Sequence, residues 1–141
     1  MTLNERQEEI IEEFSIFDDW MDKYNYLIEL SKDLPVIDPK YKTNEYLIEG
    51  CQSKVWLFAE IDGEKLKYMA DSDAIITKGI AALLVRVLSD QKPADIINND
   101  LYFLDKIGLQ QNLSPTRSNG LLAMVKQMKL YAMAYNAKMG N

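Results

Sequence analysis

A single thiol is the most distinctive reactive group in this chain of 141 residues. Cys51 is the only cysteine, and it stands in the stretch Gly50-Cys51-Gln52-Ser53-Lys54. A cysteine in a loop, beside a glycine and polar residues, can be reached by a partner. Free cysteine is also among the most buried residue types, so an inert place in the hydrophobic core is the alternative.

The composition excludes the commonest ways of assisting a thiol or binding a metal. The chain has no histidine, so Ser-His-Asp and Cys-His pairs and histidine-based zinc sites are ruled out. One cysteine cannot complete a thiolate zinc site, hold an iron–sulfur cluster through four thiolates, or form an internal disulfide. We therefore expect no bound metal. Any chemistry at Cys51 is that of one thiol, tuned by neighbours other than imidazole.

Charge and hydropathy narrow the class of partner. The net charge of −6 argues against general binding to nucleic acid or to anionic membranes. The first residues lack the features of a signal peptide, and no stretch approaches the roughly 20 apolar residues of a membrane span. A lone cysteine suits a reducing compartment, so we expect a cytoplasmic protein, with residues 1–141 forming one domain.

The charges are unevenly distributed along the chain. Residues 1–22 carry eight acids against Arg6, whereas the chain from Lys106 onward has five bases and no acid. This polarity indicates either two differently solvated surfaces or a surface that a protein partner recognises.

Hydrophobic periodicity and capping residues predict several helices. The predicted helices are 4–17, a second from Asp18 or Asp19 to before Pro35, a third at 74–88, a short one opened by Pro93, and a last one capped by Ser114 with Pro115 at its first position. The third is the most apolar, so we place it at the centre of the core against the sheet. Gly79 inside it predicts close backbone packing.

The rest of the pattern predicts a small sheet. The expected strands are 46–48, 55–61 and 64–70, and Asp62-Gly63 indicates a hairpin between the last two. Cys51 then lies in the connection between the first two strands, where Gly50 is free to take a left-handed backbone conformation. The predicted fold is α/β of the α+β kind, a small three-stranded antiparallel sheet covered by helices.

Several blocks, taken together and in order, resemble a known family. They are Trp20-Met21-Asp22-Lys23-Tyr24, Ile28-Glu29-Leu30, Gly50-Cys51-Gln52-Ser53-Lys54-Val55-Trp56, Asp71-Ser72-Asp73-Ala74 with Lys78-Gly79, Pro93-Ala94-Asp95-Ile96, and Leu113-Ser114-Pro115-Thr116-Arg117-Ser118-Asn119-Gly120-Leu121. The chain resembles the SufE family of sulfur-acceptor proteins from about Trp20 to Met124. Each block alone is a weak signal, but their order and the chain length together are specific.

The resemblance implies a fold and a function. It implies a small antiparallel sheet covered by helices, in which Cys51 accepts sulfane sulfur from the persulfide of a pyridoxal-phosphate cysteine desulfurase. It also implies stimulation of that enzyme and delivery of the sulfur to an iron–sulfur cluster scaffold. Under it the chain is an accessory protein with no cofactor and no turnover of its own. The related U-type scaffolds carry several cysteines, whereas this chain has one.

The expected site extends beyond the thiol. Its members are Cys51 as acceptor, Gly50, Gln52, Ser53 and Lys54 as the supporting loop, and Asp71, Ser72, Asp73 and Arg117 as residues that meet the partner or tune the thiolate. Lys54 and Arg117 can lower the pKa of the thiol if they lie within about 4–6 Å of it, whereas apolar burial raises that pKa. A surface position for Arg117 remains the alternative. The loop and the starts of the third and last helices form one docking patch if those helix ends lie beside the loop.

Two other functions stay open at this stage. A redox-regulated adaptor would use Cys51 to form sulfenic acid or mixed disulfides. A purely structural interaction domain would keep Cys51 in its core.

Overall fold

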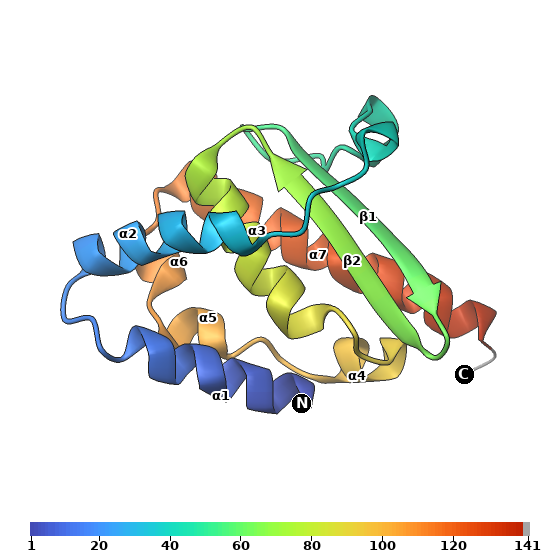
Figure 1. Ribbon diagram of the computed structural model, residues 1–141, viewed down its shortest axis with the longest axis horizontal. Helices are drawn as coiled ribbons and strands as arrows, with labels where there is room; N and C mark the ends of the chain where they lie inside the picture. Colours follow the sequence, from blue (N-terminus) through green and yellow to red (C-terminus); the bar gives the residue numbers. More distant parts are fainter. Residues whose placement is uncertain (140–141) are drawn as a thin grey trace.

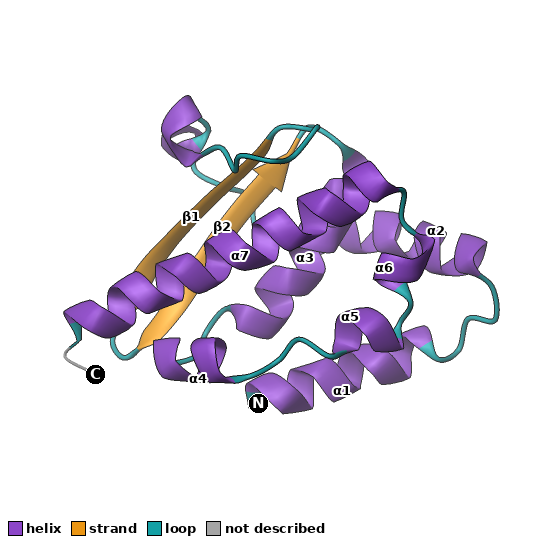
Figure 2. Ribbon diagram, turned by 180° about the vertical axis from the view of Figure 1, so that it is seen from behind, coloured by secondary structure: helices purple, strands orange, loops and turns teal. Residues whose placement is uncertain are grey.

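The computed structural model describes residues 1–139, in which helices pack against a two-stranded antiparallel sheet (Figures 1 and 2). The α-helices are α1 (Leu3–Phe14), α2 (Trp20–Leu30), α3 (Ile75–Leu88), α4 (Pro93–Asn98), α5 (Phe103–Lys106), α6 (Leu109–Asn112) and α7 (Pro115–Lys138). The strands are β1 (Val55–Asp62) and β2 (Lys65–Ser72), and short 3-10 helices span Ser31–Asp33, Pro39–Tyr41 and Asn44–Tyr46.

The hairpin of β1 and β2 confirms the turn predicted at Asp62-Gly63. The strands pair from Val55 with Ser72 to Asp62 with Lys65. Gly63 has a φ of 64°, which glycine adopts without the steric cost that a side chain brings. Alternate side chains on each strand are buried, so one face of the sheet belongs to the core.

The predicted strand at 46–48 does not form, so the expected three-stranded sheet has two strands. The pairing there is a single bridge between Leu47 and Trp56. The 3-10 helix before it directs the Tyr46 ring edge-on against Phe58 on β1, at 5.5 Å between ring centroids. The 3-10 helix ends one residue before this bridge and the left-handed Gly50 follows soon after it, so the extended segment is too short for a strand.

Helix α3 is the central element, as its composition predicts. Its residues are buried along most of its length, and it packs against both β2 and α2. A Cβ atom built on Gly79 would lie 2.2 Å from the carbonyl oxygen of Leu27 in α2. The predicted close backbone packing at Gly79 is therefore confirmed.

Helix α7 lies along the sheet and brings its start to the cysteine loop (Figure 2). Its N-cap is Ser114, as predicted, whose Oγ accepts from the Arg117 N–H at 3.3 Å. Farther along, the hydroxyl groups of Tyr131 and Tyr135 donate to the β1 carbonyls of Leu57 (3.3 Å) and Ala59 (3.2 Å). Successive turns of α7 therefore contact successive residues of β1. Within residues 1–139, no helix combines the length and the apolar composition needed to cross a membrane.

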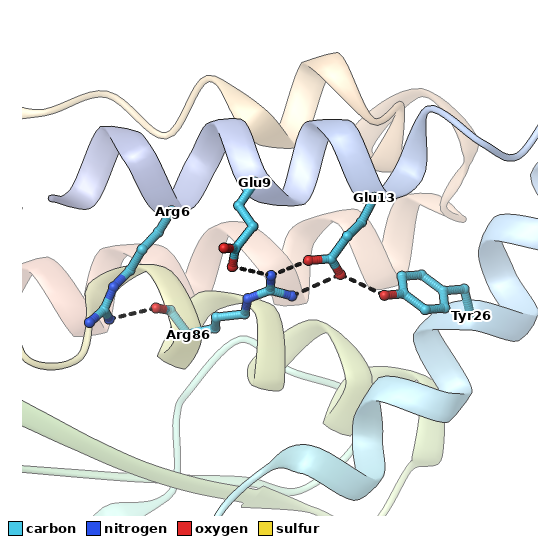
Figure 3. Close-up of polar contacts among 5 residues, drawn as sticks. All are labelled: Arg6, Glu9, Glu13, Tyr26 and Arg86. Carbon is cyan, nitrogen blue, oxygen red and sulfur yellow. Dashed lines mark hydrogen bonds and ion pairs between the residues drawn. The ribbon is translucent and has the colours of Figure 1, made fainter. Parts of the chain in front are cut away.

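Some of the acidic side chains of α1 form ion pairs with another helix of the same molecule (Figure 3). Arg86 of α3 pairs with Glu13 and, at 2.5 Å, with Glu9. The hydroxyl of Tyr26 in α2 donates to the Glu13 carboxylate at 2.6 Å. Arg6 donates to the carbonyl of Arg86 at 2.8 Å, near the end of α3. These contacts join α1, α2 and α3.

Helix α1 is shorter than the predicted helix 4–17. Thr2 caps it, and Ser15 donates its N–H to carbonyls of the last turn. Beyond this point the ring of Phe17 packs against Phe14 (6.4 Å) and Tyr26 (5.1 Å). Phe17 thus packs on these two rings from outside the helix, so the predicted helix is wrong for the backbone of residues 15–17.

Candidate functional site

Cys51 stands on a loop that is closed at its base. The N–H of Ile48 donates to the carbonyl of Val55 at 2.9 Å, so the chain leaves and returns at neighbouring points. Gly50 has a φ of 91°, which confirms the predicted left-handed conformation. The loop between Ile48 and Val55 is therefore fixed at its two ends, and its tip has few backbone hydrogen bonds.

The far side of the loop is tied to the start of α3. The Lys54 N–H donates to the Asp73 carboxylate at 3.0 Å, and the Asp73 N–H donates to the Lys54 carbonyl at 3.2 Å. The Ser72 hydroxyl donates to the same carbonyl at 2.8 Å. The segment 71–73 therefore lies beside the cysteine loop.

The thiol itself is directed at the first turns of α7. The Cys51 Sγ donates to the carbonyl of Gly120 at 3.7 Å, a long and weak contact. Gly50 approaches the same helix, because a Cβ atom there would lie 3.6 Å from the Cβ of Ala123. Cys51 is half-buried, so it lies between the exposed loop tip and the core.

A small cavity of about 80 Å³ adjoins Cys51. Its walls are formed by Cys51, Gln52, Ser53, Thr77, Ile80, Thr116, Arg117, Gly120, Leu121 and Met124. Of the residues expected at the site, Gln52, Ser53 and Arg117 share this cavity with the thiol. Gly50, Lys54 and the segment 71–73 lie outside its walls. Sequence reasoning missed the contributions of α3 and of the second turn of α7 to the site. A glycine inside the predicted last helix, within a block that carries the family resemblance, is the signal that could have marked Gly120.

The resting thiol is a weak acid. Burial raises the pKa of Cys51. Arg117 lines the cavity, but its Nη1 donates to the hydroxyl of Tyr24 at 3.2 Å. The Lys54 side chain is exposed, and its backbone makes the bonds to the segment 71–73. At neutral pH the thiol is therefore protonated at rest.

Asp71 forms ion pairs with two lysines. Its carboxylate lies 3.0 Å from the Nζ of Lys42 and 3.4 Å from that of Lys78. Burial by itself would raise the pKa of Asp71, but the hydrogen bond from Lys42, that from the Ser72 N–H and the charge of Lys78 together lower it. Asp71 and the two lysines therefore form a cluster of ion pairs at this end of the sheet, beside the cysteine loop. No group of three or more acidic, histidine or cysteine side chains suited to a metal occurs within residues 1–139.

Comparison with solved structures supports the fold. A solution structure of a hypothetical protein from Thermus thermophilus superimposes with a TM-score of 0.76, covering 92% of this chain and 94% of that one. The sequence identity of that pair is 20%, so the likeness concerns the fold alone.

Comparison with known sequences identifies the family. A SufE-like protein 1, chloroplastic/mitochondrial, of Arabidopsis thaliana is 42% identical over 93% of this chain, which spans 36% of that longer protein. An uncharacterised SufE-like protein of Rhizobium etli is 39% identical, and one of Rhizobium meliloti is 36% identical; the chain spans 86% and 91% of their lengths. Residues 8–132 match the SufE domain, described as associated with Fe-S metabolism. The chain, with its one thiol between a loop and the start of α7, therefore belongs to the SufE family.

Proposed function

We propose that this protein is a sulfur acceptor that carries sulfane sulfur as a persulfide on Cys51. The sulfur would come from a pyridoxal-phosphate cysteine desulfurase, which the protein stimulates, and would pass to an iron–sulfur cluster scaffold. The observation that carries the proposal is the half-buried thiol beside its own cavity in a SufE-family chain. The protein needs no cofactor for this role and performs no turnover alone.

The transfer step is a thiol exchange at sulfur. The Cys51 thiolate attacks the outer sulfur of the donor's cysteine persulfide, and a new S–S bond forms as the donor's S–S bond breaks. The donor cysteine leaves as a thiolate and takes up the proton that Cys51 released. The sulfane sulfur keeps its oxidation state, so no external oxidant or reductant is required. One thiol is sufficient, and a second cysteine nearby would instead resolve the persulfide into a disulfide.

The cavity supports the storage part of the proposal. Its volume of about 80 Å³ exceeds the ~10–15 Å³ that a cavity needs, by the same measure, to hold one water molecule. One additional sulfur atom on the Cys51 Sγ therefore has room beside Thr77 and Gly120, partly sheltered from solvent. Shelter protects a persulfide from stray thiols and oxidants, whereas delivery requires contact with another protein.

Transfer then requires the loop to open. Burial raises the pKa of the resting Cys51 thiol, so outward movement into water would lower the pKa and expose the nucleophile at the same time. The bonds at Ile48 and Lys54 hold the two ends of the loop, which leaves residues 49–53 as the part that moves. Docking of the partner would supply the free energy for this change.

The docking patch consists of the loop 49–54, the segment 71–73 and the residues 114–118. Bonds at Lys54 fix the second segment beside the loop, and the shared cavity wall fixes the third. Arg117 and Lys54 supply exposed positive charge at this patch. Charges at the rim of an interface mainly set the rate of association.

The redox adaptor is less well supported. Oxidation to sulfenic acid follows thiolate character and exposure, and the resting Cys51 has a raised pKa and is half-buried. A purely structural role for the thiol is also less well supported, because Cys51 stands on a loop and borders a cavity. Treatment with peroxide in the absence of a desulfurase distinguishes the redox adaptor from the sulfur acceptor. The adaptor would yield a stable product oxidised at Cys51.

Desulfurase turnover tests the proposal. Consumption of cysteine by the desulfurase should accelerate when the protein is added, and Cys51→Ser should abolish that acceleration while keeping the circular dichroism spectrum. Arg117→Ala should need a higher protein concentration for half-maximal acceleration, whereas Lys138→Ala, at the far end of α7, should behave as the wild type. Acceleration by Cys51→Ser equal to that of the wild type would refute the acceptor role, and equal curves for the two α7 variants would reduce the patch to the loop.

A further inference from the structure

The Arg117 side chain is held by a residue of another helix. Its Nη1 donates to the hydroxyl of Tyr24 at 3.2 Å, which joins the start of α7 to α2. The Tyr24 ring packs against the hydrophobic core and lies edge-on to Trp20, with 6.5 Å between the ring centroids. The packed ring of Tyr24 therefore holds its hydroxyl in place as the acceptor for the Arg117 guanidinium.

The backbone of Arg117 is fixed as well. Its N–H donates to the Ser114 Oγ in the N-cap of α7, so a change in the guanidinium position requires rotation of the side chain only. Within residues 1–139 no carboxylate lies within 4.0 Å of this guanidinium. The Tyr24 hydroxyl is the one partner found for it there.

Arg117 is also the charged residue of the cavity. The cavity walls come from the cysteine loop, α3 and α7, and Cys51 is the one other side chain in them that can ionise. Lys54 and Asp73 lie beside the loop but outside these walls, and Tyr24 faces Arg117 from α2. Any electrostatic control of the thiol from within the cavity must therefore act through Arg117.

We propose that Tyr24 is a positioning residue that holds the Arg117 guanidinium at the cavity wall and off the Cys51 sulfur in the resting protein. Release from the Tyr24 hydroxyl lets the guanidinium turn to the sulfur and stabilise its ionised form. The resting contact keeps the thiol protonated, and the released arginine activates it. The use of this device in sulfur transfer rests on the proposed function; the contact and its effect on the thiol do not.

The raised pKa of Cys51, caused by burial, is consistent with this arrangement. An opposite charge within about 4–6 Å lowers the pKa of an acidic group by about one to three units. Freeing Arg117 should therefore shift the pH at which Cys51 becomes reactive downward. The shift must disappear when the guanidinium is removed.

The experiment is a pH profile of Cys51 alkylation by iodoacetamide in the isolated protein. Tyr24→Phe, which keeps the ring and loses the hydroxyl, should lower the midpoint of the profile by about one pH unit. Arg117→Ala alone should leave the midpoint at the wild-type value, and Tyr24→Phe with Arg117→Ala should return it to that value. Tyr26→Phe, on the same helix but bonded to Glu13, is the matched control and should leave it unchanged. The limiting rate at high pH reports access to the thiol, so an opened cavity is distinguished from a changed pKa.

Two results would overturn the proposal. One is a Tyr24→Phe midpoint equal to or above that of the wild type. The other is a raised midpoint in Arg117→Ala alone, because the arginine would then already stabilise the resting thiolate. Tyr24→Leu also lacks the hydroxyl and should lower the midpoint if the phenylalanine variant folds poorly. The assay contains no desulfurase, so its result is independent of whether Cys51 accepts sulfur.

Discussion

The Sγ of Cys51 lies 3.7 Å from the carbonyl oxygen of Gly120, and a Cβ atom built on Gly120 would lie at the same distance from that sulfur. The absence of a side chain at this position in α7 therefore leaves space beside the thiol. Alanine would fill part of the cavity with a methyl group while keeping an ordinary van der Waals distance to the sulfur.

Gly120→Ala should separate stability from function. Alanine is favoured over glycine inside a helix by about 1 kcal/mol, so the melting temperature should stay the same or rise. The yield of Cys51 persulfide from a desulfurase should fall severalfold, because the methyl group takes the space of the added sulfur. Asn119→Ala, exposed at the preceding position, is the control. Equal persulfide yields for the two variants would mean that the cavity does not store sulfur.

The pH dependence of the wild-type thiol follows from its burial. Since burial raises the pKa of Cys51, the alkylation midpoint of the folded protein should lie above the value of about 8.5 that a free cysteine shows. Unfolding in urea should return the midpoint to that ordinary value. A folded midpoint at or below it would show that a positive charge already reaches the resting thiol.

The elements around the site follow from local signals in the sequence. Gly50 predicts a left-handed loop residue, Asp62-Gly63 a hairpin, and Ser114-Pro115 the start of the last helix, because each depends on a few adjacent residues. The central place of α3 and the close packing at Gly79 follow from composition. These predictions are confirmed.

The remaining features depend on contacts between distant segments. The cavity beside Cys51 takes Thr77 from α3 and Gly120 from α7, and no local pattern marks their convergence. The strand expected at 46–48 is reduced to one bridge, and Tyr46 instead ends a 3-10 helix with its ring on Phe58, which is a tertiary contact. Arg117 could be selected from the resemblance, but its bond to Tyr24 joins residues that are 93 positions apart in the sequence.

Gly79→Ala should destabilise the fold strongly. The added Cβ would lie 2.2 Å from the Leu27 carbonyl oxygen, so α2 and α3 must move apart. Overpacking of this kind costs about 1–3 kcal/mol, and a backbone clash belongs at the upper end of that range. Urea denaturation measures the loss, with Ala134→Ser, exposed on α7, as the control. An unfolding free energy equal to the wild-type value would contradict the close approach of these helices.

The ion pair between α1 and α3 should make stability fall in acid. The hydrogen bond from Arg86 lowers the pKa of Glu13 below its ordinary value of 4.5. A carboxyl group with a lowered pKa stabilises the folded state above its unfolded pKa and loses this contribution as the pH falls through the folded pKa. The contribution is therefore complete at pH 7 and declines below about pH 4.5.

Glu13→Gln tests this ion pair. It should lower the free energy of unfolding by about 1–2 kcal/mol at pH 7, and the difference from the wild type should shrink below pH 4.5. Glu12→Gln, which changes an exposed neighbour, should have little effect at either pH. A Glu13→Gln difference that stays constant from pH 7 to pH 3 would mean that the ion pair is not its cause.

The acceptor role of Cys51 is tested most directly by the mass of the protein after incubation with a cysteine desulfurase and cysteine. The wild type should gain the mass of one or more sulfur atoms, the gain should map to the peptide that contains Cys51, and a reductant should remove it. Cys51→Ser, folded by circular dichroism, should gain none. Sulfur on the serine variant, or an unchanged wild-type mass while the desulfurase turns over, would contradict the assignment of Cys51 as the acceptor.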